Sequence, residues 1–418
     1  MHAATLDARE TRDPAEREAA LMAALPALVA RAKAGSPAQA ERLAQVEAAA
    51  VASRAALADL PVLRKHDLLA RQQAARAAGG DPFGGFSACG WGGLGLPRAA
   101  RRVFQSPGPL YEPQGLGADA WRMSRALHAA GFRRGDLVHN SFSYHLTPAG
   151  AIMEEGALAL GCTVFPGGVG NTELQLQAMR DLRPHGYCGT PGFLKIVLEQ
   201  AGGPLSLTKA LLSGEACPPA LRDWFAARGV AAYQCYATAD IGLIAYETPA
   251  REGLVLDEGV IVEIVGPDDR PVPEGEIGEV VVTSLDADYP LLRFGTGDLS
   301  AVLPGRCPTG RTNTRIRGWM GRADQTAKVR GMFVHPSQVQ EIVRRCPGLE
   351  RVRLVVTGAM ASDAMVLHAE CAAPDEGLRA RVAEAIREVT RLRGEVHWCG
   401  PGTLPDDGRL IDDRRDHA

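Results

Sequence analysis

The last third of the chain contains the stretch Tyr289-Pro-Leu-Leu-Arg-Phe-Gly-Thr-Gly-Asp298, followed by Gly321-Arg-Ala-Asp324 and Lys328-Val-Arg-Gly331. The first segment predicts a strand that ends in a tight Gly-Thr-Gly turn and presents the carboxylate of Asp298. Such a carboxylate can accept hydrogen bonds from both hydroxyl groups of a ribose. We therefore interpret the stretch as part of a nucleotide site, with a capping carboxylate in an ordinary glycine-rich turn as the alternative.

Charged residues follow where a large domain would give way to a small one. Arg322 offers a planar fork of donors to a ribose or a phosphate. Asp324 is a candidate hinge residue, because a rotating domain needs a few positions that absorb large backbone changes. Gly331 would allow the backbone to approach a ligand closely. For each residue alone, a solvated charged loop that enters a strand is the alternative.

Length and composition indicate a globular protein with one large and one smaller domain. The chain has 418 residues, of which 46% are hydrophobic and 23% charged, values that predict a packed core. A net charge of -3 gives no electrostatic footprint for nucleic acid or an acidic membrane. The N-terminus lacks a leader pattern, and we expect a cytoplasmic protein.

Nine cysteines are scattered without a C-x-x-C pair, which argues against a disulfide framework or a zinc knuckle. We expect them to be reduced and to fill small spaces in the core.

The spacing of apolar residues predicts a parallel α/β sheet in the middle of the chain. Residues 1–76 are rich in Ala, Arg and Glu and predict a helical surface segment whose first dozen residues are disordered. From residue 121, predicted helices alternate with short apolar strands, and Asn171 is a candidate N-cap. The expected helices cover 121–130, 149–160, 171–179, 191–200 and 218–227, and the strands 136–140, 162–165, 186–189, 209–212 and 230–235.

Beyond residue 245 the pattern changes to a small antiparallel β-subdomain, with strands expected at 260–265, 279–283 and 291–294. Residues 322–418 predict the order β-α-β-β-α-β, a compact α+β unit that can act as a lid. The predicted fold class is therefore α/β. A large N-terminal domain (1–321) would hold the parallel sheet and the β-subdomain, and 322–418 would form a small α+β lid domain.

Further motifs occur in the same order as in a known family. They include Pro166-Gly-Gly-Val-Gly-Asn-Thr-Glu-Leu-Gln, Ser213-Gly-Glu-Ala and Tyr236-Ala-Thr-Ala-Asp240. With the three segments quoted first, they give a chain that resembles the phenylacetate–CoA ligase branch of the adenylate-forming enzymes over residues 60–404. The resemblance implies that the large domain joins ATP and a carboxylic acid as an acyl-adenylate. The lid then rotates so that CoA can attack.

The resemblance also implies roles for particular residues. Gly214 and Glu215 would flank the adenine and Tyr236 would stack on it. Asp298 and Arg322 would hold the ribose.

A second set of implied roles concerns the acid substrate. Phe142, Tyr144 and His145 would lie near the acyl pocket, where an aromatic acid is the usual family substrate. A cluster of strand-end aromatic side chains packed in the core is the alternative.

The phosphate side departs from the family pattern. The family's Ser/Thr/Gly-rich loop falls at Gln105-Ser-Pro-Gly-Pro-Leu-Tyr-Glu-Pro113, where only Ser106 and Gly108 keep the phosphate-binding character. The prolines remove amide donors and Glu112 adds a like charge, so we expect weak binding of pyrophosphate.

Two other motifs also differ. The family's Y-G-x-T-E, whose Glu binds magnesium, is altered, but Asp240 can still bind Mg²⁺ and Thr238 can contact the α-phosphate. No lysine follows Lys328, and Arg409 stands where the family carries its catalytic lysine. Lys328, Arg409 and Asp240 are the catalytic candidates.

Three hypotheses follow. The first is an AMP-forming acyl- or aryl-CoA ligase that uses ATP, Mg²⁺ and CoA. The second is an adenylation-deficient relative that performs only the transfer, to CoA or to a carrier-protein thiol. The third is a non-catalytic nucleotide-binding protein. We favour the first, and the resemblance makes a homodimer unsurprising.

Overall fold

The computed structural model describes residues 5–89, 100–323, 325–330, 332–358, 363–405 and 409–415. The chain divides into two compact units, Met1–Met320 and Gly321–Ala418. This division lies one residue before the boundary expected from the sequence. The mixture of parallel and antiparallel sheets with helices confirms the predicted α/β class.

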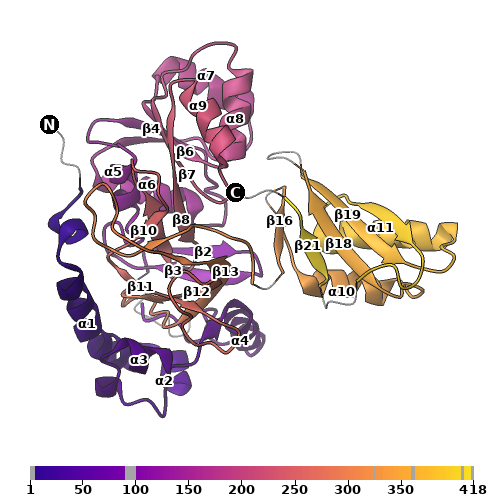
Figure 1. Cartoon of the computed structure of the whole chain (residues 1–418), viewed down its shortest axis with the longest axis horizontal. Helices are drawn as coiled ribbons and strands as arrows, with labels where there is room; N and C mark the ends of the chain where they lie inside the picture. The colour runs from indigo at the N-terminus through magenta and orange to yellow at the C-terminus, as the bar shows by residue number, and fades with distance from the viewer. Residues whose placement is uncertain are drawn as a thin grey trace. The chain divides into compact units, whose positions relative to one another are not determined.

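A nine-stranded sheet forms the centre of the first unit, and five of its strands are parallel, in the order β5-β4-β6-β7-β8. These strands are β4 (Leu137–Asn140), β5 (Thr163–Pro166), β6 (Gly186–Gly189), β7 (Lys209–Leu212) and β8 (Ala231–Thr238). The connecting helices are α5 (Met123–Ala129), α6 (Ala149–Ala159), α7 (Thr172–Leu182), α8 (Pro191–Gln200) and α9 (Pro219–Ala226). Helices α7, α8 and α9 gather in one place (Figure 1), whereas α5 packs against α6.

Asn171 stands at the predicted N-cap position of α7, but it does not cap the helix. Asn171 precedes the helix, but its backbone is left-handed (φ 49°) and its side chain makes no capping hydrogen bond. A capping side chain reaches the first free amides from an extended backbone, which Asn171 does not have.

The antiparallel half of the same sheet continues from β8 through β9 (Gly242–Glu247), β10 (Leu254–Leu256), β15 (Arg315–Ile316) and β14 (Val302–Leu303). A separate hairpin is formed by β2 (Arg102–Ser106) and β3 (Leu110–Gln114). It contains the segment in which the sequence predicted a phosphate loop.

The β-subdomain is a second sheet with the order β1-β13-β12-β11. Its strands are β1 (Leu63–Arg64), β11 (Val260–Val265), β12 (Gly278–Ser284) and β13 (Phe294–Ser300). The strand expected at 291–294 is wrong, because the strand begins only at Phe294 and runs to Ser300. Leu291 and Leu292 are fully buried without belonging to a strand, so their apolar character reflects burial alone.

The N-terminal segment is helical, as predicted, but its beginning is ordered. It contains the 3-10 helices η1 (Ala8–Thr11) and η2 (Ala48–Ala50) and the helices α1 (Pro14–Gly35), α2 (Pro37–Arg42), α3 (Arg54–Ala58) and α4 (Lys65–Ala77) (Figure 1). The prediction of a disordered first dozen residues is wrong for the described positions. Glu10 is 1% exposed and forms ion pairs with Arg125 and Arg311, both at 2.7 Å, so buried charge pairing fixes this end.

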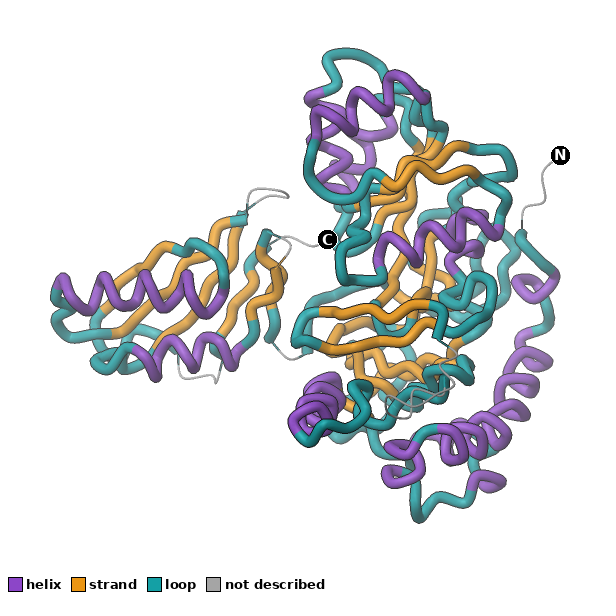
Figure 2. Tube along the Cα trace, turned by 180° about the vertical axis from the view of Figure 1, so that it is seen from behind, coloured by secondary structure: helices purple, strands orange, loops and turns teal. Residues whose placement is uncertain are grey.

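The second unit is a four-stranded sheet with two helices (Figure 2). Its sheet has the order β20-β19-β18-β21, and α10 packs on α11. The predicted first strand is instead a hairpin, because the chain turns back between its two halves. The elements are β16 (Ala327–Val329), β17 (Met332–Val334), α10 (Pro336–Arg345), β18 (Val352–Thr357), β19 (Ala364–Glu370), α11 (Glu376–Thr390), β20 (Glu395–Cys399) and β21 (Ile411–Asp413).

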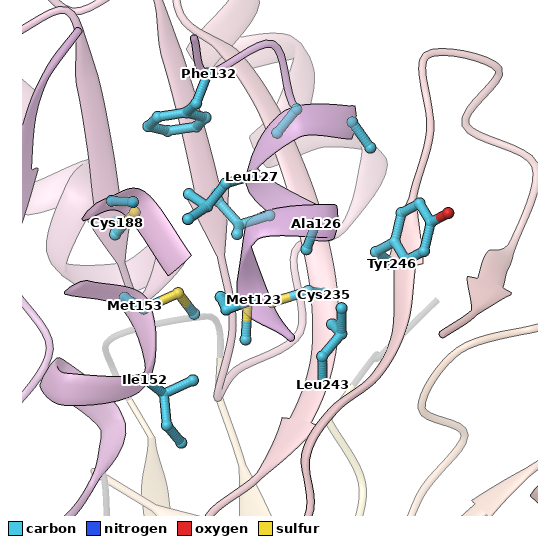
Figure 3. Close-up of a cluster of buried hydrophobic side chains, with 14 of the residues drawn as sticks. Met123, Ala126, Leu127, Phe132, Ile152, Met153, Cys188, Cys235, Leu243 and Tyr246 are labelled. Atoms are coloured by element: carbon cyan, nitrogen blue, oxygen red, sulfur yellow. The ribbon is translucent and has the colours of Figure 1, made fainter. Parts of the chain in front are cut away.

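One hydrophobic cluster of the first unit lies between α5, α6 and the large sheet (Figure 3). Met123 and Leu127 of α5 face Ile152 and Met153 of α6, and all four are nearly or fully buried. All nine cysteines are free thiols, and seven of them, including Cys188, are buried, which confirms the predicted role as core residues. In the part of the chain that the structure describes, no helix combines the length and apolar character needed to cross a membrane.

Candidate active site

The predicted ribose carboxylate lies between two aromatic side chains. Tyr236, near the end of β8, donates from Oη to Oδ2 of Asp298 at 2.7 Å. Trp319 donates from Nε1 to Oδ1 at 3.0 Å. Asp298 is 8% exposed, so both oxygens are held in a fixed orientation. The structure thus brings together two residues predicted from the sequence and adds Trp319. The signal in the sequence that could have identified Trp319 is its position just before the Gly321-Arg-Ala-Asp324 motif.

The local backbone explains how Asp298 is presented. It lies within β13, so the predicted tight turn is wrong. The pairing of β12 with β13 shifts its register between Glu279 and Val281, and Gly297 adopts φ +73°, a value that favours glycine. The hydroxyl of Thr296 accepts from the amide of Asp298 at 3.1 Å and donates to a carbonyl of β12 at 2.9 Å. This irregularity in the strand changes the direction in which the carboxylate of Asp298 points.

The predicted adenine residues follow β7, at the carboxyl end of the parallel strands, where α/β sheets commonly bind ligands. Gly214 has φ +81°, and both Gly214 and Glu215 are exposed. Oε2 of Glu215 accepts from the amide of Gly192 in the first turn of α8 at 3.1 Å. Ser213 fixes the start of this loop by donating to the carbonyl of Cys235 on β8 at 2.9 Å.

The phosphate side contains a charge cluster that the sequence did not predict. Asp240, two residues after β8, forms an ion pair with Nζ of Lys65 at 2.9 Å. Ser106 donates from Oγ to Oε1 of Glu112 at 2.7 Å. Burial, followed by the nearby carboxylate of Asp240, raises the pKa of Glu112 well above its usual range. Nothing in the sequence pattern indicated Lys65, because it lies 175 positions before Asp240.

Two other predicted phosphate residues are constrained by the fold. The hydroxyl of Thr238 accepts from the amide of Ile241 at 3.2 Å and so closes the turn that leads to Asp240. Gly108 lies between β2 and β3 with φ +153°, and a Cβ there would lie 2.9 Å from Cδ1 of Leu69. The loop is therefore a hairpin turn packed on α4, and Ser106 is buried in it.

The three predicted acyl-pocket residues occupy different surroundings. Phe142 is 8% exposed and belongs to the core, and His145 is exposed. Tyr144 lines a cavity of about 350 Å³ whose other lining residues are Arg102, Phe104, Thr147, Ala151, Glu154 and Pro166. The hydroxyl of Tyr144 accepts from Nδ2 of Asn140 at 2.8 Å. Of the three, Tyr144 is the one that lines this cavity.

The remaining predicted residues belong to the second unit. Lys328 lies on β16, Arg409 is exposed just before β21, and Arg322 is half-buried. The hinge candidate Asp324 and Gly331 lie outside the described residues. Among the residues that the structure describes, no group of three or more His, Cys, Asp and Glu side chains could hold a metal ion.

Comparisons with known proteins identify the family of this chain. Residues 118–285 match the family model described as AMP-binding enzyme. The phenylacetate–coenzyme A ligase of Thermus thermophilus is 31% identical, with 78% of this chain and 80% of that protein covered. The enzyme of the same name from Pseudomonas putida is 32% identical, with 68% and 69% covered.

Solved structures share the fold. A 2-hydroxyisobutyryl-CoA ligase in complex with 2-HIB-AMP and CoA superposes with a TM-score of 0.81 at 24% identity, over 98% of this chain and 92% of that one. The same ligase in its postadenylation state gives a TM-score of 0.70 at 25% identity, over 97% and 92%. At these identities the likeness shows the fold, whereas the sequence relatives show the family. The chain belongs to the phenylacetate–coenzyme A ligase family of AMP-binding enzymes.

Proposed function

We propose that the protein is an AMP-forming ligase that activates a carboxylic acid as its acyl-adenylate and transfers the acyl group to CoA. One observation carries the proposal beyond family membership: the buried carboxylate of Asp298, oriented by Tyr236 and Trp319. Two fixed acceptor oxygens beside aromatic rings suit a ribose with an adenine stacked next to it.

The nucleoside half of the site has defined roles in this proposal. Tyr236 stacks on the adenine, and Gly214 and Glu215 border its edge. Asp298 and Arg322 hold the ribose, the first as acceptor and the second as donor.

The phosphate half requires Mg²⁺, and the residues present fit such an ion. Oδ1 of Asp240 and Oε2 of Glu112 are buried and have no N–H or hydroxyl donor among the described residues, and the two carboxyl groups contact each other. Mg²⁺ in nucleotide enzymes is commonly bound by one or two carboxylates together with substrate phosphates. Bound there, it would neutralise phosphate charge, while Thr238, Ser106 and the backbone at Gly108 border the phosphates.

The lid supplies the remaining charges. Arg409 stabilises the charge that develops during adenylation, Lys328 contributes a second cation, and Asp324 serves as the hinge. We expect an aromatic acid in a pocket bordered by Tyr144, with Phe142 and His145 near it. CoA is the proposed acceptor in place of a carrier-protein thiol, in a cytoplasmic enzyme that acts as a homodimer.

A transfer-only enzyme is the second candidate, and one observation favours it. The carboxylate proposed to hold Mg²⁺ is already paired with Lys65, so the metal must displace an ammonium group before it binds both oxygens. An enzyme that receives a preformed acyl-adenylate would not need that exchange.

ATP–pyrophosphate exchange distinguishes the two candidates. The purified protein is incubated with Mg²⁺, labelled pyrophosphate and a panel of aromatic and short aliphatic acids. Acid-dependent exchange is the expected result and identifies the substrate class. Absence of exchange with every acid, together with AMP binding in calorimetry and thioester formation from a supplied acyl-adenylate, would refute adenylation and establish the transfer-only enzyme.

A further inference from the structure

Three buried polar atoms of the first unit have no N–H or hydroxyl donor among the described residues, and their side chains interact with one another. They are Oε2 of Glu112, Oδ1 of Asp240 and the hydroxyl of Tyr289, and the carboxyl groups of Glu112 and Asp240 contact each other closely enough to share a proton. Their residues are only 3%, 8% and 4% exposed. Buried polar groups are paired in the large majority of cases, so such a group calls for a water, an ion or a functional role. Three at one place indicate a site for a ligand.

The sign of the charges identifies the ligand. The carboxyl groups of Glu112 and Asp240 contact each other, and the ammonium group of Lys65 pairs with Asp240 at 2.9 Å. Ser106 already donates to the other oxygen of Glu112 and has no second proton to give. The unfilled carboxyl oxygens of Glu112 and Asp240 are acceptors, and the hydroxyl of Tyr289 can accept as well as donate, so all three oxygens can face a cation. Oxygen ligands in this number select a hard divalent ion such as Mg²⁺.

We propose that Glu112 joins Asp240 as a ligand of the divalent cation that accompanies ATP, and that Lys65 is the resident counter-ion which leaves Asp240 when the cation arrives. The proposal rests on the proposed function, because it assigns a second protein ligand to the same metal. Glu112 lies in the segment where the family pattern has a phosphate loop, so it would replace direct phosphate contacts by a metal-mediated contact.

The position of Lys65 is consistent with this exchange. Its side chain is 41% exposed, whereas that of Asp240 is 2% exposed. The lysine can therefore swing into solvent or towards a phosphate, while the carboxylate stays in place. It lies at the first position of α4, directly after β1, so its backbone is anchored at one end by the strand.

Mn²⁺ titration followed by electron paramagnetic resonance tests the proposal, with and without a non-hydrolysable ATP analogue. The variant Glu112→Gln keeps the size of the side chain and can still accept from Ser106, while its amide can donate to Asp240. We expect thermal stability to be kept and Mn²⁺ affinity in the nucleotide complex to fall about tenfold or more. Equal affinity in Glu112→Gln and the unaltered protein would overturn the proposal, as would no Mn²⁺ binding by the unaltered protein.

Two further variants sharpen the result. Glu247→Gln changes another buried carboxylate, paired with Arg222 at 2.8 Å, and is expected to leave Mn²⁺ affinity unchanged. Lys65→Met is expected to raise Mn²⁺ affinity in the absence of nucleotide, because it removes the competitor for Asp240; unchanged affinity would refute the counter-ion role. If metal binding depends on Glu112 but no acid supports pyrophosphate exchange, the metal site stands and the proposed adenylation is refuted. If exchange occurs but metal binding does not depend on Glu112, the adenylation stands and the metal site is refuted.

Discussion

Replacing Asp298 by asparagine separates the ligand-binding role of this side chain from its role in the fold. The native carboxylate accepts from Tyr236 and from Trp319. In Asp298→Asn, the amide oxygen can face the indole N–H and the amide nitrogen can face the tyrosine hydroxyl, which accepts as readily as it donates. Both aromatic partners therefore keep a hydrogen bond, and the fold should tolerate the change.

Nucleotide binding should not tolerate it. A ribose hydroxyl that donates to a carboxylate makes a charge-assisted hydrogen bond, which contributes about 1.5–3 kcal/mol. Losing one such bond converts to a decrease in AMP affinity of about 10- to 150-fold. In Asp298→Ala the loss is compounded, because the hydrogen bonds of Tyr236 and Trp319 to this carboxylate are lost as well. Since both are half-buried, we expect the free energy of unfolding to fall by about 2–4 kcal/mol and AMP binding to be abolished.

Isothermal titration calorimetry with AMP and urea denaturation measure the two effects on the same preparations. Tyr236→Phe is the matched control, because it keeps the ring and removes only the hydroxyl, and AMP affinity should fall less than in Asp298→Asn. If Asp298→Asn binds AMP as tightly as the unaltered protein, the ribose assignment is wrong, and the carboxylate then serves only to hold the two aromatic side chains.

Three further predictions concern the lid, the N-terminal segment and the core. Arg409→Ala should slow acyl-adenylate formation and leave thioester formation from supplied adenylate intact; equal losses in both half-reactions would refute the division of roles. Although burial acts to raise the pKa of Asp7, hydrogen bonds from Arg125 prevail and lower this pKa below 3.8. The stability that the Asp7–Arg125 pair contributes is therefore present above pH 3.8 and is lost as the pH falls below it. The melting temperature of Asp7→Asn should thus lie below that of the unaltered protein at pH 7, and a difference that does not shrink towards pH 2 would contradict this reasoning. Gly186→Ala places a Cβ against the ring of Phe132 and should cost about 1–3 kcal/mol in chemical denaturation, part of which Phe132→Leu in the same chain should recover.

The sequence predicted the parallel sheet well because that part of the fold is locally encoded. Strands β6 and β7 and helix α8 begin and end at the predicted residues, since each is a short apolar run or an amphipathic repeat. The two-residue strand β1 and the three-residue strand β21 carry no such repeat. They exist because β13 and β18 offer them a partner, and that information lies far away in the chain.

The residues of the site show the same difference between features encoded locally and features that depend on the fold. The resemblance indicated Tyr236 and Asp298 because both lie in recognisable motifs. Trp319 was missed although it lies just before the Gly321-Arg-Ala-Asp324 motif, whereas the importance of Lys65 arises only from where the fold places it. Nothing in the sequence around Lys65 distinguishes it from other lysines. The pairing of β1 with β13 places it next to Asp240, where the two side chains form an ion pair.

Glu112 shows why the effect of a single charge cannot be read from a motif alone. Judged against the phosphate loop of the family, a carboxylate at this position repels a triphosphate and weakens its binding. In the metal site proposed above, the same side chain beside Asp240 would bind the cation that a triphosphate carries, because two carboxylates balance the charge of one divalent ion. The sign of its contribution therefore depends on its neighbours: Glu112 should disfavour metal-free ATP and favour metal-bound ATP. Under this proposal, a substitution that looks like a loss of function in the sequence is a change in how the phosphates are bound.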